Sequence, residues 1–167
     1  MIRAAALCLL LIVVAIVAVP MDQASSPTTI SYHADLAAMT RTAPYQVVAP
    51  AGLRASWSPV NSGVAVGGAN GAGTVTWRLG YTTPTGTFAA LEETNAAAGP
   101  FIRRMTNSGT PQGPVQVGTR TWNSLENSER GQRSLAVTGP AGVTLVVTGN
   151  ASWAQLHTLA ASLRTEG

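Results

Sequence analysis

The side chains able to do acid–base or metal chemistry are few in this sequence, and their spacing does not bring them together. The 167 residues hold seven carboxylates and two histidines. Glu92 and Glu93 are adjacent on a predicted strand, so we expect them to point to opposite faces, where they cannot act as a catalytic pair. His33 and His157 lie far apart, and only Asp35 accompanies the first, whereas a metal site needs three or four converging ligands. The sequence therefore predicts no catalytic residue and no metal site.

Two further patterns that carry chemistry in other proteins are incomplete here. The glycine-rich stretch 67–73 superficially resembles a phosphate loop, but a dinucleotide fingerprint needs G-x-G-x-x-G between a strand and a helix, and here a strand follows. No G-x-S-x-G nucleophile elbow occurs, and the one cysteine, Cys8, lies in an apolar run. We expect stretch 67–73 to be a hairpin loop and no cofactor to be bound, while a catalytic triad assembled from distant residues stays open.

Large aromatic rings and paired arginines are the remaining candidates, and they indicate binding. The four tryptophans are spread along the chain, and we expect them to fill a core. The alternative is an aromatic-lined groove for a sugar, lipid or peptide, which requires two or more rings to be exposed together. The one adjacent pair of arginines could meet anionic lipid headgroups or a cell-wall anion. The candidate ligand or partner surface comprises Trp57, Trp77, Trp122, Arg103 and Arg104.

Charge and composition exclude several classes of protein. All ten basic residues are arginines, and apart from that pair they are scattered, whereas nucleic-acid-binding proteins gather positive charge on one face. The net charge is only +3, and we predict no nucleic-acid partner. With 46% apolar and 10% charged residues, the chain does not have a disordered composition, and its single cysteine excludes a disulfide scaffold.

The N-terminus carries an apolar segment that predicts export. An unbroken apolar run covers residues 4–19, and as a helix it is slightly shorter than the hydrocarbon core of a bilayer. A cleaved signal peptide needs small residues at −3 and −1, and the available sites fit that rule poorly, so an uncleaved single-pass anchor over residues 1–21 is favoured. Arg3 then leaves the N-terminus in the cytoplasm and residues 22–167 outside. The expected partner of residues 1–21 is the cell membrane.

The exported part divides into a short tether, residues 22–30, and one domain, residues 31–167, which is long enough for an ordinary core. Residues 75–82 give the clearest strand, because apolar and polar residues alternate there. Ser152 and Gln155 form a capping box ahead of an apolar stripe and predict a final helix. The other expected elements are a helix at 32–41, strands at 45–48 and 57–66 with Pro59 marking an edge or bulge, hairpins at 75–94 and 134–148, a helix at 101–106, a loop at 107–113, one strand from 115 to 122 and a surface loop at 123–132.

This order of elements predicts the fold class. Strands that follow one another and are bracketed by helices are typical of α+β proteins. We therefore expect an antiparallel sheet with helices packed on one face, preceded by a single N-terminal transmembrane helix.

Several short motifs, in order, resemble one known family. They are residues 30–32, residues 41–53, Trp57, residues 77–84 with Gly86, Gly118 with Trp122, and residues 146–149 with the final helix. Together they are similar to the membrane-anchored family catalogued as domain of unknown function 4245, found in high-GC Gram-positive bacteria, over roughly residues 5–164. The resemblance implies one N-terminal transmembrane helix and an exported domain, and no established activity. This chain departs from the family at Arg54, where proline is usual, and in the inserted stretch 67–73.

We expect the exported domain to be a binding or scaffolding module for a cell-envelope partner, a protein or a lipid. The alternatives are a cell-envelope hydrolase and a binding module for an apolar or glycan ligand. A pocket with converging polar groups and a perturbed acid would favour the enzyme. A smooth surface with one apolar patch would favour partner binding, and a deep pocket lined by tryptophans would favour the ligand-binding module.

Overall fold

A seven-stranded antiparallel sheet organises the part of the chain that the computed structural model describes, residues 29–67 and 73–166. Its strand order is β2-β3-β4-β8-β7-β6-β5. In chain order these strands are β2 (Ser58–Val66), β3 (Val75–Thr82), β4 (Phe88–Thr94), β5 (Thr110–Val117), β6 (Arg120–Asn127), β7 (Gln132–Thr138) and β8 (Thr144–Gly149). The α+β class and the antiparallel sheet are thereby confirmed.

Three helices and a short two-stranded ribbon complete the described fold. The helices are α2 (His33–Thr42), α3 (Ala98–Met105) and α4 (Trp153–Ser162), with a 3-10 turn at Ser128–Arg130. The ribbon pairs β1 (Val48–Pro50) with β9 (Leu163–Thr165). No helix among the described residues is long and apolar enough to cross a membrane, and the expected anchor, residues 1–21, lies outside them.

The strands predicted from clear alternation are present. The hairpins at 75–94 and 134–148 are β3–β4 and β7–β8. β2 is an edge strand with an irregularity between Pro59 and Asn61, as the missing N–H of proline requires. Val66 pairs with Val75, so the chain reverses across the glycine-rich stretch, of which residues 68–72 lie outside the described part.

The prediction for residues 107–132 was wrong. The single strand at 115–122 is in fact two antiparallel strands, β5 and β6, and the loops expected at 107–113 and 123–132 are in part strand, since β5 begins at Thr110 and β6 runs to Asn127. Val117 pairs with Arg120, and Gly118 between them has a positive φ of 59°, which glycine adopts without strain. Because one face of β5 and β6 meets solvent, their polar residues hide the strand pattern.

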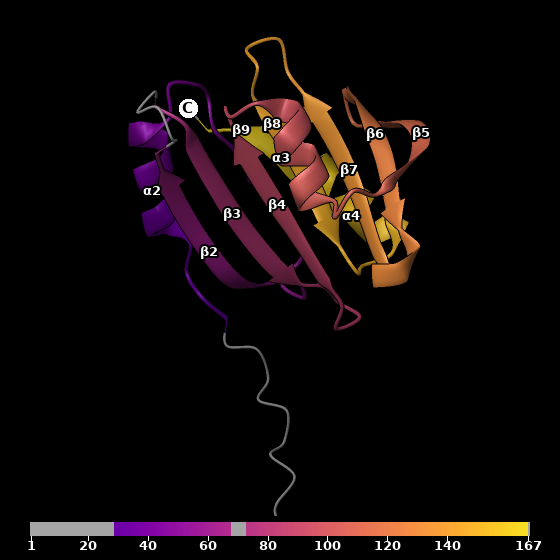
Figure 1. Ribbon diagram of the computed structural model, residues 1–167. Coiled ribbons are helices and arrows are strands. Elements are labelled where there is room, and N and C mark those ends of the chain that lie inside the picture. The colour runs from indigo at the N-terminus through magenta and orange to yellow at the C-terminus, as the bar shows by residue number, and fades with distance from the viewer. Residues whose placement is uncertain (1–28, 68–72, 167) are drawn as a thin grey trace, which may run out of the picture.

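The prediction that the helices pack on one face was also wrong, because they cover both faces. Figure 1 shows α3 on the near side of the sheet and α4 behind it. The residues of β7 and β8 alternate accordingly: Leu135 and Val147 belong to the cluster under α4, and Ala136 and Val146 pack with Phe101 of α3. Every residue of β8 is buried, and a strand buried on both faces needs a cover on each.

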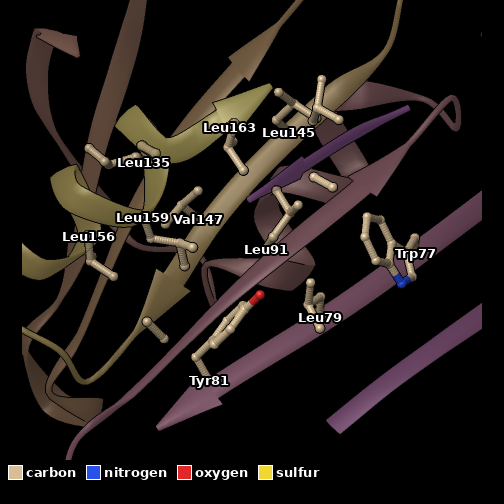
Figure 2. Packing of buried hydrophobic residues seen from close by; sticks show 14 of the residues in the cluster. Trp77, Leu79, Tyr81, Leu91, Leu135, Leu145, Val147, Leu156, Leu159 and Leu163 are labelled. Carbon is tan, nitrogen blue, oxygen red and sulfur yellow. The ribbon is translucent and has the colours of Figure 1, made fainter. Parts of the chain in front are cut away.

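The larger core lies between the sheet and α4, with α2 closing the side next to β2 and β3. Figure 2 shows Trp77, Leu79 and Tyr81 in a row along β3, with Leu156 and Leu159 of α4 packed on the same face of the sheet. The predicted capping box is confirmed, since Ser152 accepts from the backbone of Gln155 and the side chain of Gln155 accepts from the backbone of Ser152. This box fixes where α4 begins.

The ribbon of β1 and β9 lies over the same face as α4. Val48 and Leu163 are buried in the larger core, and Ala49 pairs with Arg164. The sequence predicted a strand slightly earlier, at 45–48, and gave no sign of β9. Three residues directly after a helix are too few to show a period of two, so only packing defines this strand.

Candidate functional site

The three tryptophans proposed as a ligand surface belong to the core. Trp57 is 7% exposed, and Trp77 and Trp122 are fully buried. The indole N–H of Trp77 donates to the Ser62 hydroxyl at 3.2 Å. The condition for an aromatic groove, two rings exposed together, is therefore not met by these three residues.

Arg103 and Arg104 lie on the other side of the sheet, on α3. Both are exposed, and the Arg104 guanidinium sits 5.5 Å from the centre of the Phe101 ring. The buried Glu92 lies on this face and pairs with Arg78 at 3.0 Å. Burial raises the pKa of Glu92 to about 7, while Arg78 and Arg104 oppose that shift. The structure does not bring the arginine pair and the tryptophans together.

Glu93 faces the larger core, opposite to Glu92, as the alternation of strand residues predicted. Its side chain is fully buried under the ribbon. The backbone N–H of Val48 in β1 donates to both carboxylate oxygens, each at 3.3 Å. Burial raises the pKa of Glu93 to about 8, and the Val48 hydrogen bond and the charge of Arg120 oppose that shift. At neutral pH this carboxyl is mostly protonated.

A cavity of about 540 Å³ lies between the ribbon and the end of the sheet at which Glu93 is placed. The floor of the cavity is a row of residues paired across three strands. Glu93 of β4 is opposite Leu145 of β8, and Leu145 is opposite Val137 of β7. The β7–β8 turn forms one wall with Pro140, and Val143 follows that turn. The cavity has the size of a site for a small molecule.

Tyr45 contributes an unpaired polar atom to this region. The residue lines the cavity and is partly exposed, while its hydroxyl oxygen is buried and has no hydrogen-bond partner among the described residues. Burial raises the pKa of Tyr45, and the charge of Glu93 adds to that rise. Buried polar atoms without partners are uncommon in folded proteins, and among the described residues the indole N–H of Trp122, which does not line this cavity, is the other one.

Arg120, at the start of β6, is the accessible charged residue of the cavity. Apart from Glu93 it is the only charged side chain among the lining residues, and it is partly exposed. In the described part of the chain it forms no ion pair and no side-chain hydrogen bond within the usual distances. Arg120 therefore brings a positive charge to the wall of this cavity and of a neighbouring hollow of about 350 Å³, with no carboxylate within ion-pair distance among the described residues.

A second hollow, of about 710 Å³, lies between the loop after β1 and α4. It is lined by Leu53, Arg54, Trp57 and Arg164, among others, and holds no carboxylate. The Arg164 guanidinium donates to the carbonyl oxygens of Ala161 and Leu163, so it is engaged in ending α4. The cavity beside Glu93 is the stronger candidate, because its lining includes a buried carboxyl and the unpaired hydroxyl of Tyr45.

The arrangement around Glu93 is suited to binding. Arg120 and a protonated Glu93 can donate hydrogen bonds, and the cavity lining includes no histidine, cysteine, serine or second carboxylate. Its hydroxyl groups belong to Tyr45, Thr121, Thr138 and Thr165, and in the described part of the chain none of them is hydrogen-bonded to a histidine or carboxylate that could serve as its base. Across residues 29–67 and 73–166, no three histidine, cysteine or acidic side chains converge as metal ligands would.

The fold is an α+β domain built on a seven-stranded antiparallel sheet, with a cavity of about 540 Å³ at one end of that sheet. The chain belongs to the family described as Protein of unknown function (DUF4245), whose model matches residues 1–163. The resemblance found from the short motifs is thereby confirmed.

Comparison with other proteins adds little about activity. No curated protein matches the sequence. Among solved structures, the crystal structure of MucB in complex with MucA(peri) is similar to this chain with a TM-score of 0.42 and 11% sequence identity. The likeness covers 72% of this chain but only 36% of that one, and it says nothing of what this chain binds.

Proposed function

We propose that this protein is a membrane-anchored extracytoplasmic binding domain that takes a small-molecule ligand of the cell envelope in the cavity beside Glu93. The observation that carries the proposal is a ligand-sized cavity with apolar walls, one accessible arginine and no nucleophile–base pair. Residues 1–21 would hold the chain in the cell membrane with the N-terminus in the cytoplasm, as their apolar run and Arg3 predict.

The position of the cavity fits a domain tethered from its N-terminus. Ile30, near the start of the described chain, donates its backbone N–H to Pro59 at the beginning of β2. Pro59 is opposite Tyr81 of β3, which is opposite Ala89 of β4, so these three residues form one row across the sheet. Glu93 lies four residues further along β4, about 13 Å at the usual rise of a strand. The cavity is therefore toward the end of the sheet remote from the tether.

A photo-crosslinking experiment in living cells tests this proposal and captures a ligand whatever its identity. A photoreactive phenylalanine analogue is placed at Val143, in the cavity wall, or at Val66, which is 63% exposed on the distant edge strand β2. The full-length chain is exported and irradiated, and the intact protein is weighed. We expect an adduct of small-molecule mass at position 143 and none at position 66. Equal labelling at both positions, or no small adduct at 143, would refute the proposal.

A scaffolding role toward a protein partner predicts a different result from the same experiment. Such a partner would crosslink at a surface position and leave position 143 without a small adduct. Membrane attachment is tested separately, by alkaline washing of membranes and protease treatment of intact spheroplasts. If the chain is released by the alkaline wash, residues 1–21 are a cleaved signal, and if the domain is protected until lysis, the orientation is reversed.

One observation favours an enzyme as a second candidate. Glu93 is a perturbed acid beside a pocket, the condition that favours a hydrolase, and a carboxyl with a pKa of about 8 can act as a general acid at neutral pH. Glu93→Gln separates the two candidates, because glutamine keeps the shape and the acceptor for Val48 but cannot give up a proton. Binding should survive this substitution, whereas general-acid catalysis should not.

A further inference from the structure

We infer that the ligand of this cavity is a free, single-chain amphiphile with an oxyanion headgroup, a carboxylate or a phosphate, that binds Arg120 while its apolar chain lies along Val137, Val143 and Leu145. This inference rests on the proposed function and names the class of ligand.

Charge is the first argument for an anionic headgroup. Arg120 is partly exposed on the cavity wall, and the structure gives it no carboxylate within ion-pair distance in the described residues. The ionisable side chains that line the cavity are those of Glu93, Tyr45 and Arg120. Because the Glu93 carboxyl is buried, the wall offers no exposed acidic group that would attract a cation. The planar guanidinium of arginine matches carboxylate and phosphate oxygens, to which it can donate two parallel hydrogen bonds.

The protonation of Glu93 strengthens this argument. Its side chain is fully buried beneath Val48, and its raised pKa keeps most of it neutral at pH 7. The protonated Glu93 therefore leaves the charge of Arg120 uncancelled. An anion bound to Arg120 would favour the protonated form of Glu93 further, since two neighbouring negative charges repel each other.

The walls supply the argument for an apolar chain. Val137 and Leu145 form the sheet side of the cavity, and Pro44, Pro140 and Val143 line its rim. The volume of about 540 Å³ suits one short chain and is small for a two-chain lipid.

The location indicates a ligand taken from solution. With Ile30 bound to Pro59 at the other end of the sheet, a tether that leads to the membrane starts away from the cavity. A site for lipids of the anchoring bilayer would be expected near the tether. We therefore assign a dissolved amphiphile as the ligand, and make a bilayer lipid one outcome of the test.

Calorimetry on the full chain in zwitterionic nanodiscs tests the headgroup. The probes are octanoate, octyl phosphate, 1-octanol and octyltrimethylammonium, which share one chain length and differ in charge, and titrations of empty nanodiscs are subtracted. We expect both anions to bind about 10- to 100-fold more tightly than the alcohol, as a hydrogen bond to a charged group implies, and the cation to bind most weakly.

Two arginine variants locate the effect. Arg120→Gln should bring the affinity for octanoate down to that for octanol, whereas Arg130→Gln, which removes the same charge from an exposed residue of the 3-10 turn, should change nothing. Arg120→Lys keeps the charge without the planar group and should give an intermediate affinity. The circular dichroism spectrum and thermal midpoint of each variant show that it is folded.

The outcomes separate this inference from the proposed function. Equal binding of octanol and octanoate, or an unchanged octanoate affinity in Arg120→Gln, overturns the anionic headgroup and leaves a binding cavity in place. If none of the four probes binds and position 143 collects no small adduct in cells, the proposed function fails as well. If the crosslinked adduct has the mass of a two-chain membrane lipid, the free amphiphile is refuted.

Discussion

Replacing Glu93 by glutamine should make the stability of the domain less dependent on pH. In the folded protein Glu93 is fully buried and burial raises its pKa to about 8, from 4.5 for an ordinary glutamate. Below pH 4.5 the carboxyl is protonated in both folded and unfolded chains. As the pH rises toward 8, the unfolded chain gains a stable carboxylate that the folded chain does not form, so the wild type loses stability across this interval.

The size of this loss follows from the two pKa values. Each pH unit in the interval costs about 1.4 kcal/mol, which gives a ceiling of roughly 5 kcal/mol between pH 4.5 and pH 8 and about 3 kcal/mol at pH 7. Glutamine can still accept the N–H of Val48 through its amide oxygen, so its intrinsic cost is expected to be about 1 kcal/mol. The free energy of unfolding of Glu93→Gln, measured relative to that of the wild type, should therefore increase by about 2 to 4 kcal/mol as the pH is raised from 5 to 8.

Urea unfolding at pH 5, 6, 7 and 8 measures this difference. Tryptophan fluorescence reports only on the domain, because all four tryptophans follow residue 56, and the full chain can be reconstituted in zwitterionic nanodiscs for the purpose. Glu129→Gln, which changes an exposed carboxyl in the 3-10 turn, is the matched control and should give a flat difference.

One result would refute the reasoning about Glu93. A difference between wild type and Glu93→Gln that stays constant from pH 5 to pH 8 would mean that the carboxyl is already ionised in the folded chain over this interval, with a pKa at or below its ordinary value of 4.5. In that case the positive charge that Arg120 brings to the cavity would also be offset by the Glu93 carboxylate.

Three further changes test the fold by urea unfolding. Gly149→Ala should lower the free energy of unfolding by more than about 3 kcal/mol, because a Cβ there would collide with the backbone of β4. Gly63→Ala is the control, since Gly63 has open space around it, and should change stability by less than about 1 kcal/mol. Equal effects of the two substitutions would contradict the register of β4 and β8. Ser152→Ala should cost about 1 kcal/mol by removing the cap of α4, and a neutral result would show that the cap is not needed. Arg78→Met should cost about 1 kcal/mol at pH 8, where Glu92 is ionised and loses its partner, and little at pH 5; a loss independent of pH would indicate lost packing alone.

Little of the candidate site could be predicted from the sequence. Alternation correctly placed Glu92 and Glu93 on opposite faces, and it also put Glu93 on the same face as the buried Leu91, which was a sign of a buried acid. Nothing in the sequence linked Glu93 to Tyr45 or Arg120. They come together only because the ribbon packs over one end of the sheet.

The sequence also proposed tryptophans as surface residues that the structure places in the core. Trp57, Trp77 and Trp122 attract interest as large rings, but their type alone does not say whether they are exposed. Trp77 was already on the apolar side of its strand, and its burial agrees with the expectation that the tryptophans fill the core. The arginine pair on α3 is exposed as proposed, and its role stays a prediction.

The sequence by itself determined the elements whose signals are local. These are the helix around residues 33–42, the two hairpins with clear alternation, the edge strand marked by Pro59 and the capping box of α4, together with the family. Such features depend on side chains within a few residues of one another, where backbone geometry and periodicity are decisive.

Only the tertiary structure decided the division of residues 110–127 into two strands, the placing of helices on both faces, and the cavity. β5 and β6 are polar on their solvent side, so the pairing of β6 with β7 and of β5 with β6 defines them more than their own pattern does. The protonation of Glu93 likewise depends on the burial imposed by the ribbon, whose Val48 lies 45 positions away in the chain. Interactions of this range depend on packing, because the free energy that shifts a pKa or orders a short strand comes from neighbours brought together by the whole fold.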